Sequence, residues 1–503
     1  MALFISYLWP YGPRDIEAPH LWIFYKQLAQ LDRAEVVFIG TDEYFRDPAY
    51  YAGQNRWEVQ EDALRRLEYP LPSAQDVASV RRFSLPASLF ERLDEKFGSR
   101  EEAARALLTQ GYEELEAELE KAFSGICRTE RPEAVLTWCN SPSLSRVAAA
   151  HGLRVIHNEL GPLRKPYFAN TAYFDLSGVN GNTEARERFL RFKAEAGHTG
   201  ALAKRELLSL ILSAEYEHLA ASEKRPFYEI GLPLQVEDDS NILAFSNGMD
   251  SRRLIEKARG LFKETEVLVR KHPAGLRDYR GAGVVMDASP NSMEFVLSCR
   301  RIATINSSVG LEGLLFDRDT TLFGDSPASF LAHRELAPEL RGASVDELLG
   351  LNFLVFGYLM PYEFLFDVDY YRWRLSGPSE REIFELHRAC HANGKGGARC
   401  SSLEVPRTAA GILTLKSAIR QRERRISELN SALEDKDQRI ERLVERLAAE
   451  REERDRIIAE KDRRIEDQAR AIAEKEALIR ELVNSRSWRM TAPIRELFKL
   501  LRG

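Results

Sequence analysis

The sequence has no apolar run approaching the ~20 residues that a membrane-spanning helix needs, so no such helix is expected. It also lacks an excess of basic residues, because 72 Lys and Arg stand against 78 Asp and Glu, for a net charge of −6. This balance excludes a protein that binds nucleic acid through general charge attraction. Cysteine is scarce, with five scattered residues, which is typical of a reducing cytosol and not of a disulfide framework.

Two kinds of local signal are missing as well. There is neither a Gly-x-Gly-x-x-Gly fingerprint nor a Walker loop to bind a nucleotide. The stretch Met1–Trp9 has no basic residues before its apolar run, and Pro10 follows it directly. We therefore expect a buried first strand at this place and no signal peptide.

The 503 residues allow two or three domains, and 44% hydrophobic with 30% charged residues is the composition of a mainly globular chain. In the first half, short apolar runs alternate with segments of helical spacing, including His20–Leu31, a helix from Pro142 and one long helix over 182–222. This alternation predicts a parallel sheet covered on both faces. The strands expected there are Ala2–Ser6, Glu35–Ile39, Ala134–Trp138 and Arg154–His157.

The same alternation repeats after a boundary near residue 225. One helix of this half should be capped by Ser289, with Pro290 at its first position. Two doubly wound domains then face a cleft, with ligands at the carboxyl ends of the strands, near Glu159, Asp239, His272 and Ser307. The strands expected in this half are Asn241–Phe245, Glu266–Arg270, Val284–Asp287, Arg301–Ile305 and Thr320–Phe323.

The segment from Gly411 to Gly503 differs from the rest, since it has one proline, no internal glycine and mostly strong helix formers. Its apolar residues recur every seven positions, which predicts a coiled coil with one stutter, an isolated charged helix being the alternative. The repeating residues are Ile419, Ile426, Leu433, Ile440 and Leu447 and, after an eleven-residue step, Ile458, Ile465, Ile472 and Ile479.

The chain ends in Ser487-Trp-Arg-Met-Thr-Ala-Pro493 and a short segment of helical spacing. A short basic amphipathic helix beside a tryptophan is typical of contact with a membrane surface, and packing on the globular part is the alternative. The apolar side chains share one face and the basic ones lie elsewhere: Ile494, Leu497, Phe498 and Leu501 against Arg495, Lys499 and Arg502.

Two loops after expected strands carry groups suited to a nucleotide phosphate. Arg270-Lys-His-Pro273 combines cations with a histidine, and Asn306-Ser-Ser-Val-Gly-Leu-Glu312 offers hydroxyls and backbone N–H groups where a helix opens. Each loop alone is better explained by helix capping or by a structural histidine. Together, in neighbouring loops of one α/β domain, they predict a nucleotide-phosphate site.

Acidic residues lie on the opposite lips of the expected cleft, in Asn158-Glu-Leu-Gly-Pro-Leu-Arg-Lys-Pro-Tyr167 and in Leu234-Gln-Val-Glu-Asp-Asp-Ser240. Such carboxylates suit acid–base or nucleophilic work at a glycosidic centre, although a single one is more often a helix cap. Two further clusters have metal-binding residue types. Asp367-Val-Asp369 sits in an aromatic stretch that favours a structural role, and His387, Cys390, His391 and Cys400 fit no common zinc finger.

Five ordered motifs, 159–167, 178–180, 234–240, 270–273 and 305–312, resemble those of bacterial capsule and O-antigen β-Kdo transferases. These enzymes move 3-deoxy-D-manno-oct-2-ulosonic acid (Kdo) from CMP-Kdo onto a growing glycan. The resemblance spans roughly residues 1–374, and it implies a GT-B-like pair of Rossmann-like domains with no metal or cofactor. The C-terminal segment also resembles the tails of membrane-associated glycosyltransferases of surface polysaccharides.

The resemblance implies a role for each motif. His272 and the Ser307–Ser308 loop would hold the CMP phosphate, with Glu312 near the nucleoside. Members of the family retain anomeric configuration, which implies double displacement with Asp239, or its neighbour Asp238, as nucleophile and Glu159 as general acid/base; the residues alone leave retention or inversion open. The other candidate binding residues, four of them cations that offset negative charge, are Arg164, Lys165, Tyr167, Asn180, Gln235, Arg270, Lys271 and Asn306.

The expected protein is a retaining β-Kdo glycosyltransferase, peripheral on the inner face of the bacterial cytoplasmic membrane. Its partners would be CMP-Kdo, a glycan or lipid-linked glycan acceptor and further copies of itself. The alternatives are a glycosyltransferase of similar fold with another nucleotide sugar, and a coiled-coil scaffold or chain-length protein with a degenerate transferase domain. The expected parts are 1–225 (Rossmann-like, acceptor side), 226–375 (Rossmann-like, CMP-sugar-binding), 376–410 (helix and linker), 411–485 (coiled coil) and 486–503 (amphipathic tail).

Overall fold

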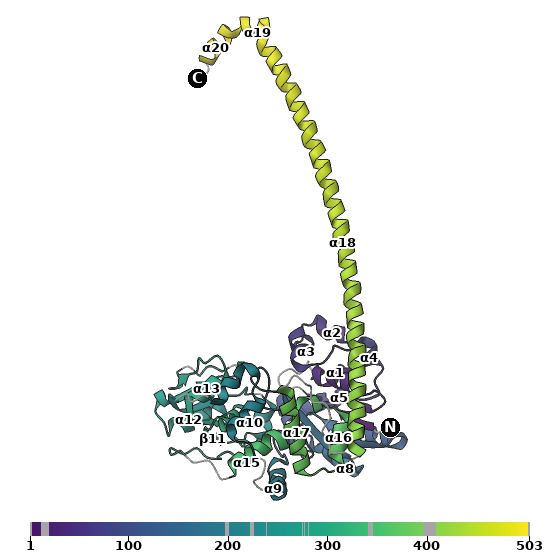
Figure 1. Ribbon diagram of the computed structural model, residues 1–503, viewed down its shortest axis with the longest axis vertical. Coiled ribbons are helices and arrows are strands. Elements are labelled where there is room, and N and C mark those ends of the chain that lie inside the picture. The colour runs from purple at the N-terminus through teal and green to yellow at the C-terminus, as the bar shows by residue number, and fades with distance from the viewer. Residues whose placement is uncertain are drawn as a thin grey trace. The chain divides into compact units, whose positions relative to one another are not determined.

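The computed structural model divides the chain into two compact units, Met1–Ala418 and Ile419–Gly503 (Figure 1). The first unit contains both β-sheets and the second contains helices alone. The residues that the structure describes are 3–11, 20–196, 201–221, 226–237, 239–273, 275, 277–279, 281–340, 346–395 and 409–500.

The first sheet has seven strands in the order β12-β6-β5-β4-β1-β2-β3. Strands β5, β4, β1, β2 and β3 are parallel to one another, and β6 pairs antiparallel with both of its neighbours, β5 and β12. Every residue of β1 is buried, as expected of a short apolar strand covered on both faces. The strands are β1 Leu3–Tyr7, β2 Val36–Thr41, β3 Arg82–Leu85, β4 Pro132–Thr137, β5 Arg154–Leu160, β6 Thr171–Asp175 and β12 Leu359–Pro361.

The second sheet has five parallel strands in the order β11-β10-β7-β8-β9. Together with the first sheet it confirms the predicted α/β fold with two Rossmann-like domains. We call the first sheet and its covering helices the first lobe, and the second sheet with its helices the second lobe. The strands are β7 Tyr228–Pro233, β8 Val267–Arg270, β9 Val285–Met286, β10 Cys299–Thr304 and β11 Asp319–Leu322.

Helices cover both sheets, and in Figure 1 α12 and α13 of the second lobe lie to the left of α1 and α3 of the first. The α-helices before β7 are α1 Leu21–Gln30, α2 Pro48–Gly53, α3 Glu61–Leu67, α4 Ala74–Ala78, α5 Ala87–Phe97, α6 Arg100–Thr109, α7 Glu113–Thr129, α8 Pro142–Ala150, α9 Ala185–Ala196 and α10 Lys204–Ile211. Those after β7 are α11 Ser240–Phe245, α12 Ser251–Arg259, α13 Ser292–Ser298, α14 Val309–Leu315, α15 Glu347–Asn352, α16 Val368–Leu375 and α17 Glu380–Lys395, with a π-helix at Phe353–Tyr358.

Three predictions about individual elements were wrong. The apolar run 241–245 is helix α11 and not a strand, because the Asp239 carboxylate caps it by accepting a hydrogen bond from the Asn241 N–H. The strand in that place is β7, which precedes the run. Helix α13 begins at Ser292 with Asn291 as its N-cap, and not at Pro290. The helical stretch after residue 182 is divided into α9, α10 and the 3-10 helix Ala214–Ala221.

The chain crosses between the lobes twice. It leaves the first lobe after β6 and returns after β11, because β12 pairs antiparallel with β6 in the first sheet. Sheet membership therefore does not follow the predicted domain limits, since β12 falls in the range 226–375. The segment 376–410, predicted as helix and linker, contains the 16-residue helix α17.

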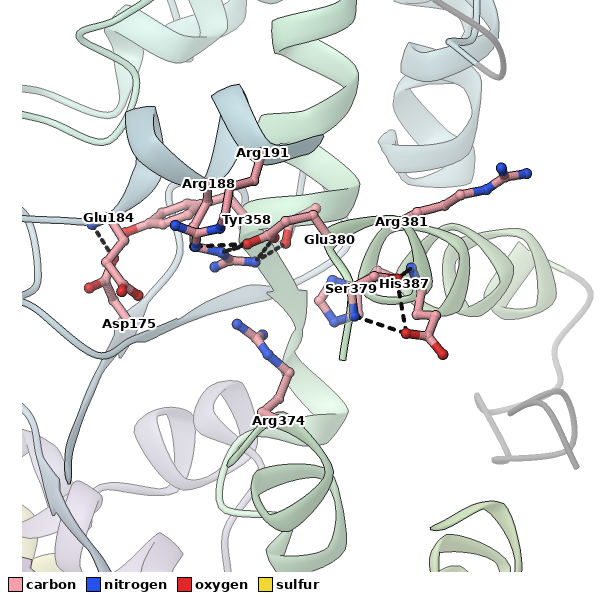
Figure 2. Close-up of polar contacts among 12 residues, drawn as sticks. Asp175, Glu184, Arg188, Arg191, Tyr358, Arg374, Ser379, Glu380, Arg381 and His387 are labelled. Atoms are coloured by element: carbon pink, nitrogen blue, oxygen red, sulfur yellow. Dashed lines mark hydrogen bonds and ion pairs between the residues drawn. The ribbon is translucent and has the colours of Figure 1, made fainter. Parts of the chain in front are cut away.

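A buried ion pair connects the segments that make these crossings. Arg188 of α9, with a side chain only 2% exposed, donates three hydrogen bonds of 2.9–3.1 Å to the Glu380 carboxylate of α17. Its Nη2 also donates to the Gly357 carbonyl of the π-helix, at 2.8 Å. Figure 2 shows Arg188 and Arg191 directed at the same carboxylate. Nearby, the Tyr358 hydroxyl donates a hydrogen bond of 2.7 Å to the Asp175 carboxylate. The pair thus joins α9, the π-helix and α17.

The second unit consists of α18 Ala409–Asn484, α19 Arg486–Met490 and α20 Ala492–Leu500, although α18 begins before the unit boundary. The 76 residues of α18 make a rod of about 110 Å at 1.5 Å per residue. Ile458, Ile465, Ile472 and Ile479 are 49–63% exposed along it. The long helix is confirmed and the coiled coil stays a prediction. No helix in the described ranges combines the length and apolar character needed to cross a bilayer.

We predict that Glu380→Ala lowers the free energy of unfolding by about 3–5 kcal/mol, because it leaves the buried Arg188 charge without its carboxylate. Arg191→Ala is the matched control, since it removes a 53%-exposed cation from the same carboxylate. That variant should cost at most about 1 kcal/mol. Urea denaturation of the full chain measures both; equally small losses would mean that the buried pair does not hold these helices together.

Candidate functional site

A cavity of about 690 Å³ lies between the carboxyl ends of the two sheets. In each sheet, strand order reverses at one place: between β1 and β4 in the first, and between β7 and β10 in the second. Loops at such a switch point separate and leave a crevice for a ligand. Trp9 and Trp138 follow β1 and β4, and Gln235 and Asn306 follow β7 and β10; all four line the cavity. Both switch points therefore open onto one space.

Most of the predicted site residues line this cavity, although they come from five separate segments of the chain. Lys165 does not, because its ammonium pairs with Glu68 at 2.9 Å and its side chain is 62% exposed. Asp238 lies outside the described residues. The predicted residues that line the cavity are Glu159, Arg164, Tyr167, Asn180, Gln235, Asp239, Arg270, Lys271, His272, Asn306, Ser307, Ser308 and Glu312.

Glu159 is the second-to-last residue of β5, on the first-lobe side of the cavity. Its Oε1 accepts a hydrogen bond of 2.8 Å from the Leu160 N–H. Burial, with a smaller contribution from the nearby Asp239 carboxylate, raises the pKa of Glu159 to about 7. Arg164, the Leu160 N–H and a hydrogen bond from Trp138 lower it in part. A carboxyl group with a pKa near 7 can take up or release a proton at neutral pH.

Asp239 belongs to the second-lobe wall, in the loop between β7 and α11. Its Oδ1 accepts a hydrogen bond of 2.9 Å from the Asn241 N–H, which fixes the carboxylate at the start of the helix. Asp239 and Glu159 come from different lobes, yet the Asp239 charge contributes to the raised pKa of Glu159. The two carboxylates therefore share one electrostatic environment.

Gln235 and Asn306 bind each other across the switch point of the second sheet. The Gln235 Nε2 donates to Asn306 Oδ1 at 2.9 Å, and the Asn306 N–H donates back to Gln235 Oε1 at 3.1 Å. The Asn306 Nδ2 also donates to the Asn241 and Phe245 carbonyls of α11, at 3.1 and 3.3 Å. Because the Gln235 and Asn306 amides form these hydrogen bonds within the protein, they fix the loops after β7 and β10. Asp239 lies in the loop after β7 and is positioned with it.

The loop that follows β6 in the first lobe packs against α11. The Asn140 Oδ1 accepts a hydrogen bond of 2.9 Å from the Val179 N–H, and its Nδ2 donates one of 2.7 Å to the Val179 carbonyl. The next residue, Asn180, has a positive φ of 64°. At Gly181 an added Cβ would lie 2.2 Å from the Phe245 ring of α11, so only glycine permits this approach. The segment 178–181 therefore meets α11, the helix that Asp239 caps.

Glu312 and Arg270 lie deep in the second-lobe wall. Glu312 is 6% exposed, and its Oε2 has no hydrogen-bond partner among the described residues. Burial raises the pKa of Glu312 to about 7, against the effects of a Ser292 hydrogen bond and of Arg270. Arg270 is paired with Asp287 and donates to the Ser289 carbonyl at 3.0 Å. Glu312 thus offers a buried acceptor for a ligand, while Arg270 is held in place.

The loop groups nearest to solvent are of the type that bind phosphate. Lys271 and His272 follow β8 and are exposed at the cavity. Ser308 precedes α14 and makes no capping hydrogen bond with its side chain, while the Ser307 hydroxyl accepts from the Val309 N–H at 3.3 Å. Arg164, across the cavity, donates to the Gly161 carbonyl at 2.6 Å.

A group of cavity residues on the first-lobe side was not predicted from the sequence. Trp9 and Trp138 could have been found, because each directly follows a strand next to the switch point of the first sheet. His20, Trp22, Trp57 and Glu58 carried no such signal, because they lie before, within or after helices of ordinary composition. All six line the cavity.

The two clusters with metal-binding residue types have other roles. Asp367 caps α16 by accepting a 2.7 Å hydrogen bond from the Tyr370 N–H, and Asp369 pairs with Arg372 at 3.5 Å. His387 and His391 are buried in α17, and Cys390 is disulfide-bonded; Cys400 lies outside the described residues. Among the described residues, no group of three or more His, Cys, Asp or Glu is arranged to hold a metal ion.

Residues 6–184 match the family model described as the glycosyltransferase 99 family N-terminal domain. This match supports, for the first lobe, the resemblance to bacterial β-Kdo glycosyltransferases that the motifs indicate. No curated protein matches the chain.

Similar solved structures include two described as Thermosulfurimonas dismutans KpsC. The β-Kdo 2,7 transferase is 16% identical, with a TM-score of 0.36, over 49% of this chain and 82% of that one. The β-Kdo 2,4 transferase is 16% identical, with a TM-score of 0.29, over 44% and 79%. UDP-GlcNAc 2-epimerase of Methanocaldococcus jannaschii is 13% identical, with a TM-score of 0.25, over 70% and 98%. These likenesses are too weak to bear on substrate or mechanism.

We predict that Glu312→Gln stabilises the ligand-free protein more at pH 8 than at pH 5. The folded chain holds a proton on Glu312 up to about pH 7, whereas the unfolded chain releases it near the ordinary pKa of 4.5. Stability therefore falls as pH rises between these values, by up to about 3 kcal/mol at ~1.4 kcal/mol per pKa unit. Glutamine carries no charge and removes this loss.

Thermal denaturation at the two pH values tests this prediction. Glu256→Gln, which removes a carboxylate that is 60% exposed on α12, controls for general effects of charge. A Glu312→Gln gain that is equal at pH 5 and pH 8 would contradict the assignment of a raised pKa to Glu312.

Proposed function

We propose that this chain is a retaining β-Kdo glycosyltransferase that transfers Kdo from CMP-Kdo to a saccharide acceptor of bacterial surface polysaccharide. Residues 6–184 carry a glycosyltransferase family domain, and the donor and stereochemistry are the parts proposed here. The observation that carries the proposal is the cavity itself, in which carboxylates from both lobes and cations from the second-lobe loops line one space.

The donor would lie along the second lobe. The Ser307 and Ser308 hydroxyls, with His272, suit the single phosphate of a CMP-sugar. The unpartnered Glu312 Oε2 suits a hydroxyl of the nucleoside, which would supply the missing hydrogen bond. Lys271 and Arg164 offset the charges of the phosphate and of the Kdo carboxylate, and the proposed reaction uses no metal ion.

The reaction would proceed by two displacements at the anomeric carbon of Kdo. Asp239 attacks that carbon, and the bond to the phosphate oxygen breaks, so that CMP leaves with the electron pair. The acceptor hydroxyl then attacks the same carbon, Glu159 takes its proton, and the bond to Asp239 breaks. Two inversions give overall retention. The pKa of about 7 lets Glu159 act as a base at neutral pH.

The second unit would place the enzyme at the inner face of the bacterial cytoplasmic membrane. Met490, Leu497 and Phe498 are 61–81% exposed at the end of the chain. The Arg495 guanidinium lies 3.8 Å from the centroid of the Trp488 ring, so basic and aromatic groups meet beside this apolar surface. Such a surface suits the interface of an anionic bilayer. The exposed isoleucines of α18 suit self-association as a coiled coil.

We predict that the protein consumes CMP-Kdo in the presence of a glycan acceptor and forms a β-linked product. Glu159→Gln should lower kcat by about 10²–10⁴-fold, the usual range for losing a general base. In the unaltered enzyme kcat/KM should rise with pH through about 7, as Glu159 ionises, and this dependence should disappear in the variant. Asp239→Ala should abolish transfer.

Nucleotide release, with NMR of the product linkage, measures these effects. Lys165→Ala is the control, because Lys165 lies outside the cavity and should leave kcat/KM unchanged. Turnover with a UDP- or GDP-sugar and none with CMP-Kdo would show that the donor is that nucleotide sugar and not CMP-Kdo. Unaltered transfer by Asp239→Ala or Glu159→Gln would remove these residues from the reaction.

We predict that deleting residues 419–503 leaves transfer to a soluble acceptor intact, because both sheets and the cavity lie in the first unit. The truncated protein should have a lower oligomer order and bind less to vesicles with anionic lipid. Light scattering and vesicle sedimentation measure these two properties. Equal oligomer order and equal vesicle binding of the full and truncated chains would count against both roles of the second unit.

A further inference from the structure

The first-lobe side of the cavity is a wall of aromatic rings. Four of the six tryptophans of the chain line this one space, namely Trp9, Trp22, Trp57 and Trp138. We call these four residues the tryptophan wall. They come from the loop after β1, from α1, from the 3-10 helix Trp57–Val59 and from the loop after β4. Segments far apart in sequence therefore supply one surface.

The tryptophan wall contacts Glu159 through Trp138. The Trp22 and Trp138 rings meet edge to face, with centroids 4.8 Å apart. The Trp138 side chain hydrogen-bonds the Glu159 carboxylate, since this bond contributes to the Glu159 pKa. An acceptor whose hydroxyl reaches Glu159 must therefore lie beside these rings.

Trp57 is the member of the wall that offers a ring to a ligand. It is 46% exposed, whereas Trp9, Trp22 and Trp138 are only 4–9% exposed and form the support. The Arg66 guanidinium lies 5.8 Å from the centroid of the Trp57 ring. An exposed, flat indole at the side of a cavity suits the apolar C–H face of a pyranose ring, because both surfaces are poorly hydrated.

The polar groups that line the tryptophan-wall side of the cavity suit hydroxyl groups, and Arg66, although near the Trp57 ring, does not line the cavity. Glu58 is 4% exposed and lines the cavity, so its carboxyl group can form hydrogen bonds with sugar hydroxyls. Burial lowers the pKa of His20 to about 4, so this imidazole is neutral at pH 7. Among the described first-lobe residues that line the cavity, Arg164 is the single Lys or Arg, whereas the second-lobe side presents Lys271, His272 and Arg270.

We infer that the tryptophan wall, with Glu58 and His20, is an acceptor subsite for an uncharged pyranose, which stacks on Trp57 and directs a hydroxyl to Glu159. A sugar acid, including Kdo itself, binds less tightly there, because Arg164 is the single Lys or Arg among the described first-lobe residues that line the cavity. The inference rests on the proposed glycosyl transfer for the orientation of the acceptor. It adds the substrate class, because the cavity then has a cationic side for an acidic donor and an aromatic, acidic side for a neutral acceptor.

Binding and turnover of matched acceptors test this inference separately. The probes are octyl glycosides of glucose, galactose and mannose, each paired with its uronic acid, and binding is followed by saturation-transfer NMR without donor. At least one neutral glycoside should bind ten-fold more tightly than its uronic acid. Trp57→Ala should weaken that binding by at least ten-fold, with Trp57→Phe intermediate, and should leave the KM for the donor unchanged.

Two further variants make the test specific. Tyr50→Ala removes a ring of equal exposure, 47%, that does not line the cavity, and it should change nothing. Arg164→Ala should widen the preference for the neutral sugar over its uronic acid, because it removes the single described first-lobe cation that lines the cavity. Equal or tighter binding of the uronic acids, or full acceptor binding by Trp57→Ala, would overturn the inference. Neutral glycosides that bind at Trp57 while CMP-Kdo is not consumed would overturn only the donor assignment.

Discussion

The carboxyl ends of parallel strands all open at the same edge of a sheet, and this chain turns two such edges toward one cavity. Each sheet reverses its strand order once, and the loops on the two sides of each reversal are the ones that reach the cavity. A side chain just after one of these strands therefore lies at the cavity, however far apart the strands are in the sequence. The rest of the structure keeps the two edges facing each other: the Arg188–Glu380 pair at the crossings, and the contact of Gly181 with Phe245 at α11.

Charge divides the cavity into two sides with different chemistry. The second lobe contributes cations and hydroxyls at the ends of β8 and β10, whereas the first lobe contributes indole rings and the carboxyl groups of Glu58 and Glu159. Between them lies a pair of carboxylates, one from each lobe, and burial keeps the pKa of Glu159 near 7. An acidic donor and a neutral acceptor would each meet the side that suits it, with the reacting atoms between Asp239 and Glu159.

Strand periodicity and loop chemistry made much of this predictable from sequence. Runs such as Val267–Arg270 are short, apolar and followed by polar residues, so both the strand and the function-bearing loop could be located. The strand predicted at 241–245 was wrong because the four apolar residues 242–245 suit either element, and the Asp239 cap favours the helix. Trp57 and Glu58 were beyond reach, since their place in the cavity depends on how η2, the 3-10 helix Trp57–Val59, packs in the first lobe. The return of β12 to the first sheet is likewise a tertiary event with no local signal.

The central claim is that Asp239 forms a covalent bond to the transferred sugar, and mass spectrometry of the protein mixed with CMP-Kdo in the absence of acceptor tests it most directly. The account predicts an adduct with the mass of one Kdo residue, located by fragmentation to Asp239, and longer-lived in Glu159→Gln because the second displacement is slowed. Product formation without any adduct, or with the adduct on a residue outside the cavity, would contradict the account.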